Sequence, residues 1–247
     1  MQLSDFLPVP ALESAKRILC FQPHPDDNEV GAGATLAKLA RGGCEVIFVT
    51  MTDGSKGIAD AGLSAEEIRA IRQGEAAAAG EILGVSRQIF LDFVDGETPE
   101  PAGMKEAVIR LIREVQPDFV LTVDPWLPYE AHPDHRNVGL AVAEAILASG
   151  NRHYLPEGPA PWRVEALVLH ATLWPNTFVD VDGYWDQKTA AIRAHRSQFS
   201  DEEWQFLGPY FDYKARGYAE GRGCERAEAF KVLPPITLHM STDTVNF

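Results

Sequence analysis

Apolar, strand-like runs alternate with helix-like segments through the first 150 residues, and this alternation allows few folds. Strands are predicted, from runs rich in Val, Ile, Leu and Phe, at residues 18–21, 45–50, 88–91 and 118–123. Helices are predicted, from apolar spacing, a capping box and glycine stops, at residues 30–39, 64–84, 104–115 and 136–149. Strands that alternate with helices form a mostly parallel sheet with right-handed crossovers. We therefore expect a doubly wound α/β fold with helices on both faces of the sheet.

The second half of the chain has a weaker pattern. Short strands are predicted at residues 166–170 and 178–181, and a helix at residues 185–195. The Pro- and Gly-containing segment 150–162 does not resemble a linker between independent domains. All 247 residues are thus expected to form a single domain, with a Rossmann-like core over residues 1–150 and an α/β C-terminal extension over residues 151–247.

Charge and cysteine content narrow the class of partner. The net charge of −14 disfavours nucleic acid and anionic membranes, because both require clustered Lys and Arg. The three cysteines are odd in number, and the sequence shows neither a secretory leader nor an apolar run of membrane-spanning length. We expect a cytoplasmic protein that binds a small neutral molecule, with no nucleic-acid or membrane partner.

Two clusters of His, Asp and Pro each follow a predicted strand. Residues 22–28 connect the first strand to the first helix, and residues 131–135 follow the fourth strand after a loop. In the usual doubly wound order these strands are neighbours, and ligands bind at the carboxyl edge between them. A single His-Pro-Asp-Asp segment is more often a surface turn, but two such clusters at one edge favour a functional site.

His24, Asp27 and His135 are the candidate metal ligands in these clusters. A catalytic zinc typically has three ligands of this kind and a fourth position open to water. The sequence therefore predicts one Zn²⁺ per subunit, although iron, cobalt or cadmium would also suit two histidines and an aspartate.

Three further residues are predicted to take part in hydrolysis. Asp26 is the predicted general base, because attack by water requires a proton acceptor. A protonated His132 is predicted to stabilise the oxyanion, with Asp134 raising the pKa of His132 and fixing its orientation. Gly31 and Gly33 suggest a dinucleotide loop, but a third glycine is missing and the segment falls inside a predicted helix.

These motifs resemble the LmbE-like, or PIG-L, family of zinc-dependent N-acetylglucosaminyl deacetylases, most closely its diacetylchitobiose deacetylases. The resemblance spans most of the chain, with its core in residues 24–27 and 132–135 and further matches in residues 51–54, 124–130 and 191–199. It implies a doubly wound sheet, one zinc ion, and hydrolysis of an N-acetyl amide to acetate and a free amine.

The resemblance also implies two residues that bind the sugar. Arg72 and Asp95 match positions that hold sugar hydroxyls in such enzymes, whereas their local sequence alone favours a solvated helix residue and a turn former. One departure concerns tyrosine, which some relatives carry two residues before the first histidine of the second motif. Here Tyr129 lies three residues before His132, so its role as an oxyanion partner is not carried over.

The C-terminal tail suggests an assembly. Residues 232–240 are apolar for a terminus, and a terminus frays unless it packs against protein. Enzymes of the family resemble closed homo-oligomers, trimers or hexamers, in which a neighbouring subunit lines the sugar pocket. His239 is therefore predicted to contact substrate in an adjacent subunit, with a buried or surface position in its own subunit as the alternative.

Three functions remain open on the sequence alone. The first is removal of acetate from N-acetylglucosamine or N,N'-diacetylchitobiose. The second is metal-dependent hydrolysis of another N-acyl glycoside, such as a thiol-glycoside precursor. The third is a non-catalytic α/β nucleotide-binding protein. Asp26 favours an enzyme, because a protein that only binds zinc does not need a second carboxylate beside the ligands.

Overall fold

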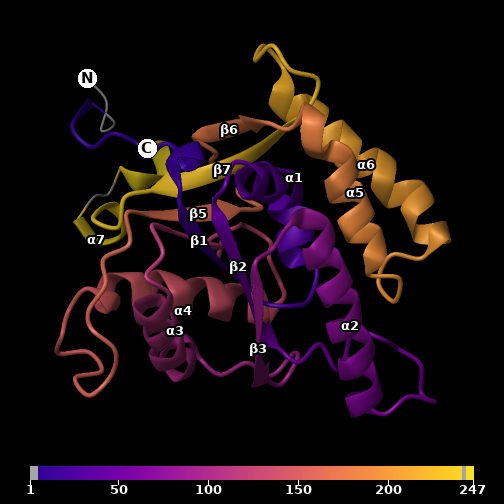
Figure 1. The fold of residues 1–247 in the computed structure, drawn as a ribbon, viewed down its shortest axis with the longest axis horizontal. Helices are drawn as coiled ribbons and strands as arrows, with labels where there is room; N and C mark the ends of the chain where they lie inside the picture. Colours follow the sequence, from indigo (N-terminus) through magenta and orange to yellow (C-terminus); the bar gives the residue numbers. More distant parts are fainter. Residues whose placement is uncertain (1–4, 241–242) are drawn as a thin grey trace.

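A seven-stranded sheet forms the centre of the computed structural model, which describes residues 5–240 and 243–247. The strand order is β3-β2-β1-β4-β5-β7-β6 (Figure 1). The first five strands run parallel, whereas β7 is antiparallel to both of its neighbours. The strand bounds are β1 (Arg17–Gln22), β2 (Glu45–Thr52), β3 (Arg87–Phe93), β4 (Phe119–Val123), β5 (Ala166–His170), β6 (Thr177–Asp180) and β7 (Ala227–Leu233).

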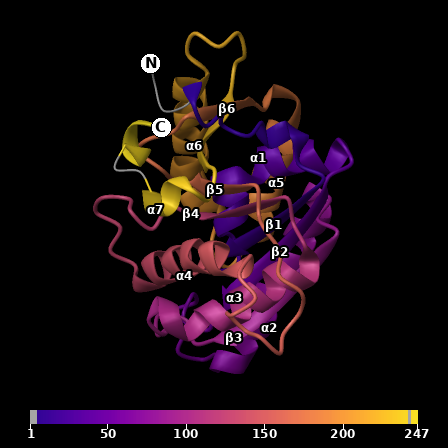
Figure 2. The ribbon, with the colours of Figure 1, turned by 90° about the vertical axis from the view of Figure 1, so that its left-hand side faces the viewer.

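Helices cover both faces of the sheet. One apolar core lies between the sheet and α1, α2, α5 and α6, and a second lies under α3 and α4, which pack side by side (Figure 2). Within the described residues, the structure has no helix with both the length and the apolar character needed to cross a bilayer. The helix bounds are α1 (Asp27–Arg41), α2 (Ala65–Leu83), α3 (Pro101–Val115), α4 (Pro133–Ser149), α5 (Trp185–Ala194), α6 (Asp201–Ala219) and α7 (Thr237–Met240).

The predicted doubly wound α/β class is confirmed, including the placement of β1 beside β4. Strands β4 and β5 are buried along their whole length, because helices cover both faces of the parallel sheet at its centre. The strands and helices of the predicted extension join this same sheet and its two faces, so β5 and β7 continue the order begun by β1 to β4.

Helices α1, α3 and α4 each begin three residues before their predicted starts, and α6, α7 and strand β7 lie where no element was predicted. Helix α4 begins at Pro133, three residues before the predicted start, because proline suits the first helical position and His132 caps the helix by accepting the main-chain N–H of Asp134. Helix α6 was not predicted. It begins with a capping box of Ser200 and Glu203 and continues through Pro209, a residue that is unfavourable inside a helix.

The two glycines that suggested a dinucleotide loop serve packing instead. A Cβ on Gly31 would lie 2.0 Å from Nδ1 of the buried His170, and a Cβ on Gly33 would lie 3.2 Å from Cγ of Lys188. Both residues lie inside α1 rather than at the turn from β1. Their missing side chains let α1 approach His170 and Lys188 closely.

Candidate active site

The two predicted clusters meet at the carboxyl edge of the sheet. The ring centroids of His24 and His132 are 4.6 Å apart, and each of these rings lies 5.3 Å from the ring of His135. His24 follows β1, whereas the other two histidines lie at the start of α4 after β4. The adjacency of β1 and β4 therefore brings together residues more than 100 positions apart in the chain.

Two overlapping groups of side chains could hold a metal ion, and both include His24. One group is His24, Asp27 and His135; the other adds Asp95, His132 and Asp134 to His24. In each group the candidate ligand atoms lie within 4.8 Å of one another. The contacts of the individual atoms distinguish the two groups.

Asp27 bridges the two histidines of the first group. Its Oδ2 lies 3.4 Å from Nδ1 of His24, and its Oδ1 lies 3.4 Å from Nε2 of His135. Two ligands that each lie about 2.1 Å from a tetrahedral ion are themselves about 3.4 Å apart. These three side chains are therefore close enough together to hold a metal ion.

Carboxylates hold the opposite nitrogens of the same two histidines. Nε2 of His24 lies 3.1 Å from Oδ2 of Asp134 and 3.2 Å from Oδ1 of Asp95. Nδ1 of His135 lies 3.2 Å from Oε2 of Glu130. Histidines that bind a metal usually donate their other ring N–H to such a carboxylate. Glu130 was not among the residues predicted for the site. Its position in the loop just before the second motif is the only sequence signal that points to it.

Main-chain and side-chain donors bind the carboxylates of the second group. Asp134 accepts hydrogen bonds from the N–H of Gly96 at 2.7 Å and from the hydroxyl of Thr98 at 2.7 Å. Asp95 accepts the N–H of Lys56 at 3.0 Å. These bonds fix both carboxylates against His24. In the first group, Oδ2 of Asp27 likewise accepts a main-chain N–H, from His24 at 2.8 Å, whereas Oδ1 of Asp27 faces His135.

The carboxylates of the site favour a positive charge on the histidine between them. Burial lowers the pKa of His24, but hydrogen bonds to Asp134, Asp27 and Asp95 outweigh it and raise this pKa to about 12. Burial raises the pKa of Asp27, yet the neighbouring His135 and His24 bring it well below its ordinary value. Ionised carboxylates crowded around imidazoles form a donor set that a divalent ion neutralises.

Asp26 is held in a strained backbone conformation beside this group. Its φ of 139° is one that residues other than glycine rarely adopt. Arg72 donates to Oδ2 of Asp26 at 3.0 Å and to the carbonyl of Pro25 at 2.9 Å. Burial and the charge of Asp27 raise the pKa of Asp26 to about 7, although Arg72 lowers it. Such a carboxylate can take and return a proton near neutral pH.

Arg72 and Asp95, the two predicted sugar ligands, are buried beside the candidate site. Arg72 is only 2% exposed and Asp95 only 5% exposed. The guanidinium of Arg72 contacts Asp26, and the carboxylate of Asp95 contacts His24. Both side chains are thus held against Asp26 and His24 by these contacts. The binding of sugar hydroxyls by Arg72 and Asp95 stays a prediction.

Asp134 contacts His132 through its main chain rather than through its carboxylate. The carboxylate of Asp134 contacts His24, and only its main-chain N–H reaches His132, where it donates to Nδ1 at 3.3 Å. Burial and the charge of His24 lower the pKa of His132, although Asp134 acts in the opposite direction. A neutral His132 that accepts at Nδ1 carries its proton on Nε2 and can still donate a hydrogen bond.

Tyr129, to which no role was assigned, and the predicted substrate residue His239 both lie at the surface. Tyr129 is fully exposed, with a φ of 70°. His239 is exposed near the end of α7. The contact of His239 with a neighbouring subunit stays a prediction.

The fold and the site together define a class of hydrolytic enzymes that have a Rossmann-like sheet and a His/Asp group able to bind a metal ion. The PIG-L family, described as GlcNAc-PI de-N-acetylase, matches residues 19–146 of the chain. The chain belongs to this family, whose members are carbohydrate N-deacetylases.

Similar proteins extend the match beyond these residues. The diacetylchitobiose deacetylase of Thermococcus kodakarensis is 38% identical and covers 96% of this chain and 90% of its own. The 1D-myo-inositol 2-acetamido-2-deoxy-α-D-glucopyranoside deacetylase of Kineococcus radiotolerans is 34% identical, over 76% of this chain and 70% of its own. The structure of the N,N'-diacetylchitobiose deacetylase from Pyrococcus horikoshii, 36% identical, superposes with a TM-score of 0.93 over 99% of this chain and 95% of its own.

Proposed function

We propose that this enzyme removes the acetyl group from N-acetylglucosamine or N,N'-diacetylchitobiose and gives acetate and a free amino sugar. The observation that carries the proposal is the group of His24, Asp27 and His135 with Asp26 beside it. This group lies in a chain whose similarity to a diacetylchitobiose deacetylase extends over 96% of its length.

The proposed ligands are His24, Asp27 and His135, and the proposed ion is one Zn²⁺ per subunit. Iron, cobalt and cadmium also suit this donor set. A divalent ion bound there would polarise the amide carbonyl and make an attacking water more acidic. Asp134 and Asp95 hold the ring of His24, and Glu130 holds the ring of His135, so both imidazoles are oriented before a metal arrives.

Asp26 is the proposed general base. It takes a proton from the water that adds to the acetyl carbon and then gives a proton to the sugar nitrogen as the C–N bond breaks. Arg72 keeps the carboxylate of Asp26 in place through its 3.0 Å hydrogen bond. On the other lip of the site, Nε2–H of His132 donates to the developing oxyanion, because the main-chain N–H of Asp134 already occupies Nδ1.

Acetate release from defined sugars tests this proposal. The zinc-loaded protein is expected to release acetate from N-acetylglucosamine and N,N'-diacetylchitobiose, and to lose this activity on chelation. The 1D-myo-inositol glycoside named for the Kineococcus relative is the competing substrate. A kcat/KM higher for that glycoside than for either chitin-derived sugar would assign the enzyme to the alternative N-acyl glycoside. The absence of acetate release from all three would reject a sugar deacetylase.

We also propose that the enzyme is a homo-oligomer, a trimer or a hexamer, in which His239 reaches a neighbouring subunit's sugar pocket. The exposed position of His239 supports this, since its imidazole is accessible to another chain. His239→Ala is expected to raise KM for the disaccharide by about 3- to 10-fold, the worth of one hydrogen bond, with kcat nearly unchanged. His153→Ala, which removes another exposed histidine, is the control. A monomer by light scattering, or an unchanged KM, would contradict the proposal.

A cytoplasmic location is proposed as well. All three cysteines, Cys20, Cys44 and Cys224, are free, which suits a reducing compartment. The acidic net charge of −14 gives no support for a nucleic-acid or membrane partner. Fractionation of cells that express the full chain checks the location.

A further inference from the structure

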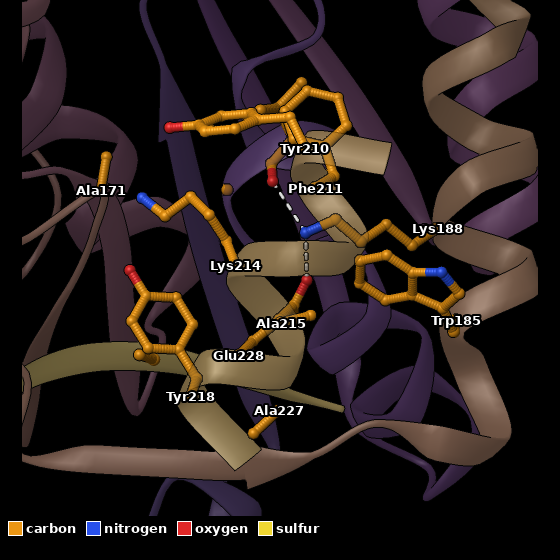
Figure 3. Close-up of a pocket in the computed structure, with 13 residues that line it drawn as sticks. Ala171, Trp185, Lys188, Tyr210, Phe211, Lys214, Ala215, Tyr218, Ala227 and Glu228 are labelled. Atoms are coloured by element: carbon orange, nitrogen blue, oxygen red, sulfur yellow. Dashed lines mark hydrogen bonds and ion pairs between the residues drawn. The ribbon is translucent and has the colours of Figure 1, made fainter. Parts of the chain in front are cut away.

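A buried ion pair from the C-terminal part of the chain contacts the helix that follows the proposed ligand loop. Lys188 lies on α5 and Glu228 on β7, and their ammonium and carboxylate groups are hydrogen-bonded (Figure 3). Their side chains are only 5% and 4% exposed. A buried pair of this kind is often no more stabilising than apolar residues of similar size, because both charges lose their hydration. Stability alone therefore does not account for the pair.

The pair binds main-chain groups in the first half of α1. Nζ of Lys188 donates to the carbonyl of Val30 at 2.7 Å, and Oε1 of Glu228 accepts the N–H of Ala34 at 3.2 Å. Oε2 of Glu228 accepts the N–H of Thr35 at 2.7 Å. In a regular α-helix the carbonyl of Val30 and the N–H of Ala34 bond to each other. The ion pair therefore binds the main-chain groups at which the first turn of α1 joins the rest of the helix.

A short chain of hydrogen bonds connects this part of α1 to Asp26. The N–H of Val30 donates to the carbonyl of Asp26 at 3.0 Å, while the carbonyl of the same Val30 is held by Lys188. Asp26 has the strained φ of 139°, and such strain persists only where the surrounding structure holds it. Asp27 is the first residue of α1, so the same turn carries the proposed ligand.

The packing around Lys188 shows that α1 accommodates the pair closely. A Cβ on Gly33 would lie 3.2 Å from Cγ of Lys188, so the absence of a side chain there admits the lysine stem. A second contact holds the same end of α1. His195, directly after α5, lies 3.3 Å from the carboxylate of Glu29, and both side chains are fully buried. The first turn is thus fixed from the C-terminal part of the chain at two points.

We propose that Lys188 and Glu228 are positioning residues for deacetylation, which set the first turn of α1 and through it the carboxylate of Asp26. This inference rests on the proposed role of Asp26 as general base. Both side chains of the pair are almost fully buried. Their contribution is to keep Asp26 in the orientation from which it can take a proton.

Removing both charges together tests the proposal without leaving one of them buried and unpaired. In Lys188→Met/Glu228→Met, the carbonyl of Val30 and the N–H of Ala34 can form the regular helical hydrogen bond with each other. The main-chain groups of α1 therefore keep hydrogen-bond partners, but the first turn is expected to shift because the contacts with Lys188 and Glu228 are lost. The double variant is expected to fold with an undiminished melting temperature. At saturating zinc, kcat is expected to fall by about 10- to 100-fold with KM changed by less than about threefold, as for a small misplacement of a catalytic group.

A double-mutant cycle with Asp26→Asn separates positioning from a purely structural role. If the pair acts through Asp26, the loss of kcat caused by the two Met substitutions shrinks to less than about threefold in the Asp26→Asn background. The control is Lys105→Met/Glu144→Met, which removes a Lys–Glu pair between α3 and α4 and is expected to keep the wild-type kcat.

Two results would overturn the inference. One is a wild-type kcat in the Lys188→Met/Glu228→Met variant, and the other is an equal fold-loss in both backgrounds. If Asp26 is not the general base, the result is different: Asp26→Asn alone would then have the wild-type kcat. That result would reject the proposed role of Asp26, and with it the inference that depends on this role.

Discussion

Loss of bound zinc and loss of acetate release are expected together in His24→Ala, Asp27→Ala and His135→Ala. Each variant removes one of three proposed ligands, so the ion keeps only two protein atoms. The fall in metal affinity is expected to exceed the roughly 10- to 100-fold that typically follows loss of an outer partner. Zinc per chain, measured after dialysis, and acetate release at low added zinc provide the two readouts.

His132→Ala is the matched control, because it removes an imidazole from the same site while leaving the three proposed ligands. It is expected to retain zinc and to lose about 10²- to 10³-fold in kcat, the usual cost of a missing oxyanion donor. The opposite pattern, with zinc retained in His135→Ala and lost in His132→Ala, would assign the metal to the second group of His24, Asp95, His132 and Asp134.

The sequence predicted that the two His/Asp clusters meet at one edge of the sheet, because the position of each cluster depends only on the order of the strands. Alternating strands and helices place β1 and β4 side by side, and ligands at the end of each strand must then share one edge. His24 and His135 are brought together in this way. No side-chain detail is needed for that inference, since it follows from strand order alone.

The partners of the individual carboxylates could not be predicted in the same way. Asp134 points to His24 rather than His132 because α4 starts at Pro133, which turns Asp134 inward within the first helical turn. A shift of three residues in a helix start changes which side chains face the site. Asp26 and Asp27 are neighbours in sequence but have different partners, because the backbone conformation points their side chains in different directions. The amino-acid sequence pattern does not show this conformation.

The C-terminal part was the least predictable because its contacts are distant in sequence. Lys188 and Glu228 lie 40 residues apart and bind a helix that begins at Asp27. Taken alone, each is an ordinary charged residue with no motif around it, and charged residues are usually exposed. Only the packing of α5 and β7 against α1 shows that these two are buried and paired.

Asp26→Asn is expected to keep the fold and the metal while losing about 10²- to 10⁴-fold in kcat, the usual worth of a positioned proton carrier. Asparagine has the shape of aspartate, tolerates positive φ, and offers an oxygen to the guanidinium of Arg72, but it cannot take a proton from water. Zinc content and kcat, measured on the same preparation, separate this role from that of Asp27.

The control for the Asp26 variant is Glu165→Gln, which makes the same carboxylate-to-amide change at an exposed site and is expected to leave kcat unchanged. If Asp26→Asn lost its zinc, Asp26 rather than Asp27 would be the ligand. If it kept both zinc and the wild-type kcat, proton transfer would have to pass through another group. The strained φ of 139° at Asp26 makes the first of these outcomes the less expected one, because Asp27 already bridges the two histidines without such strain.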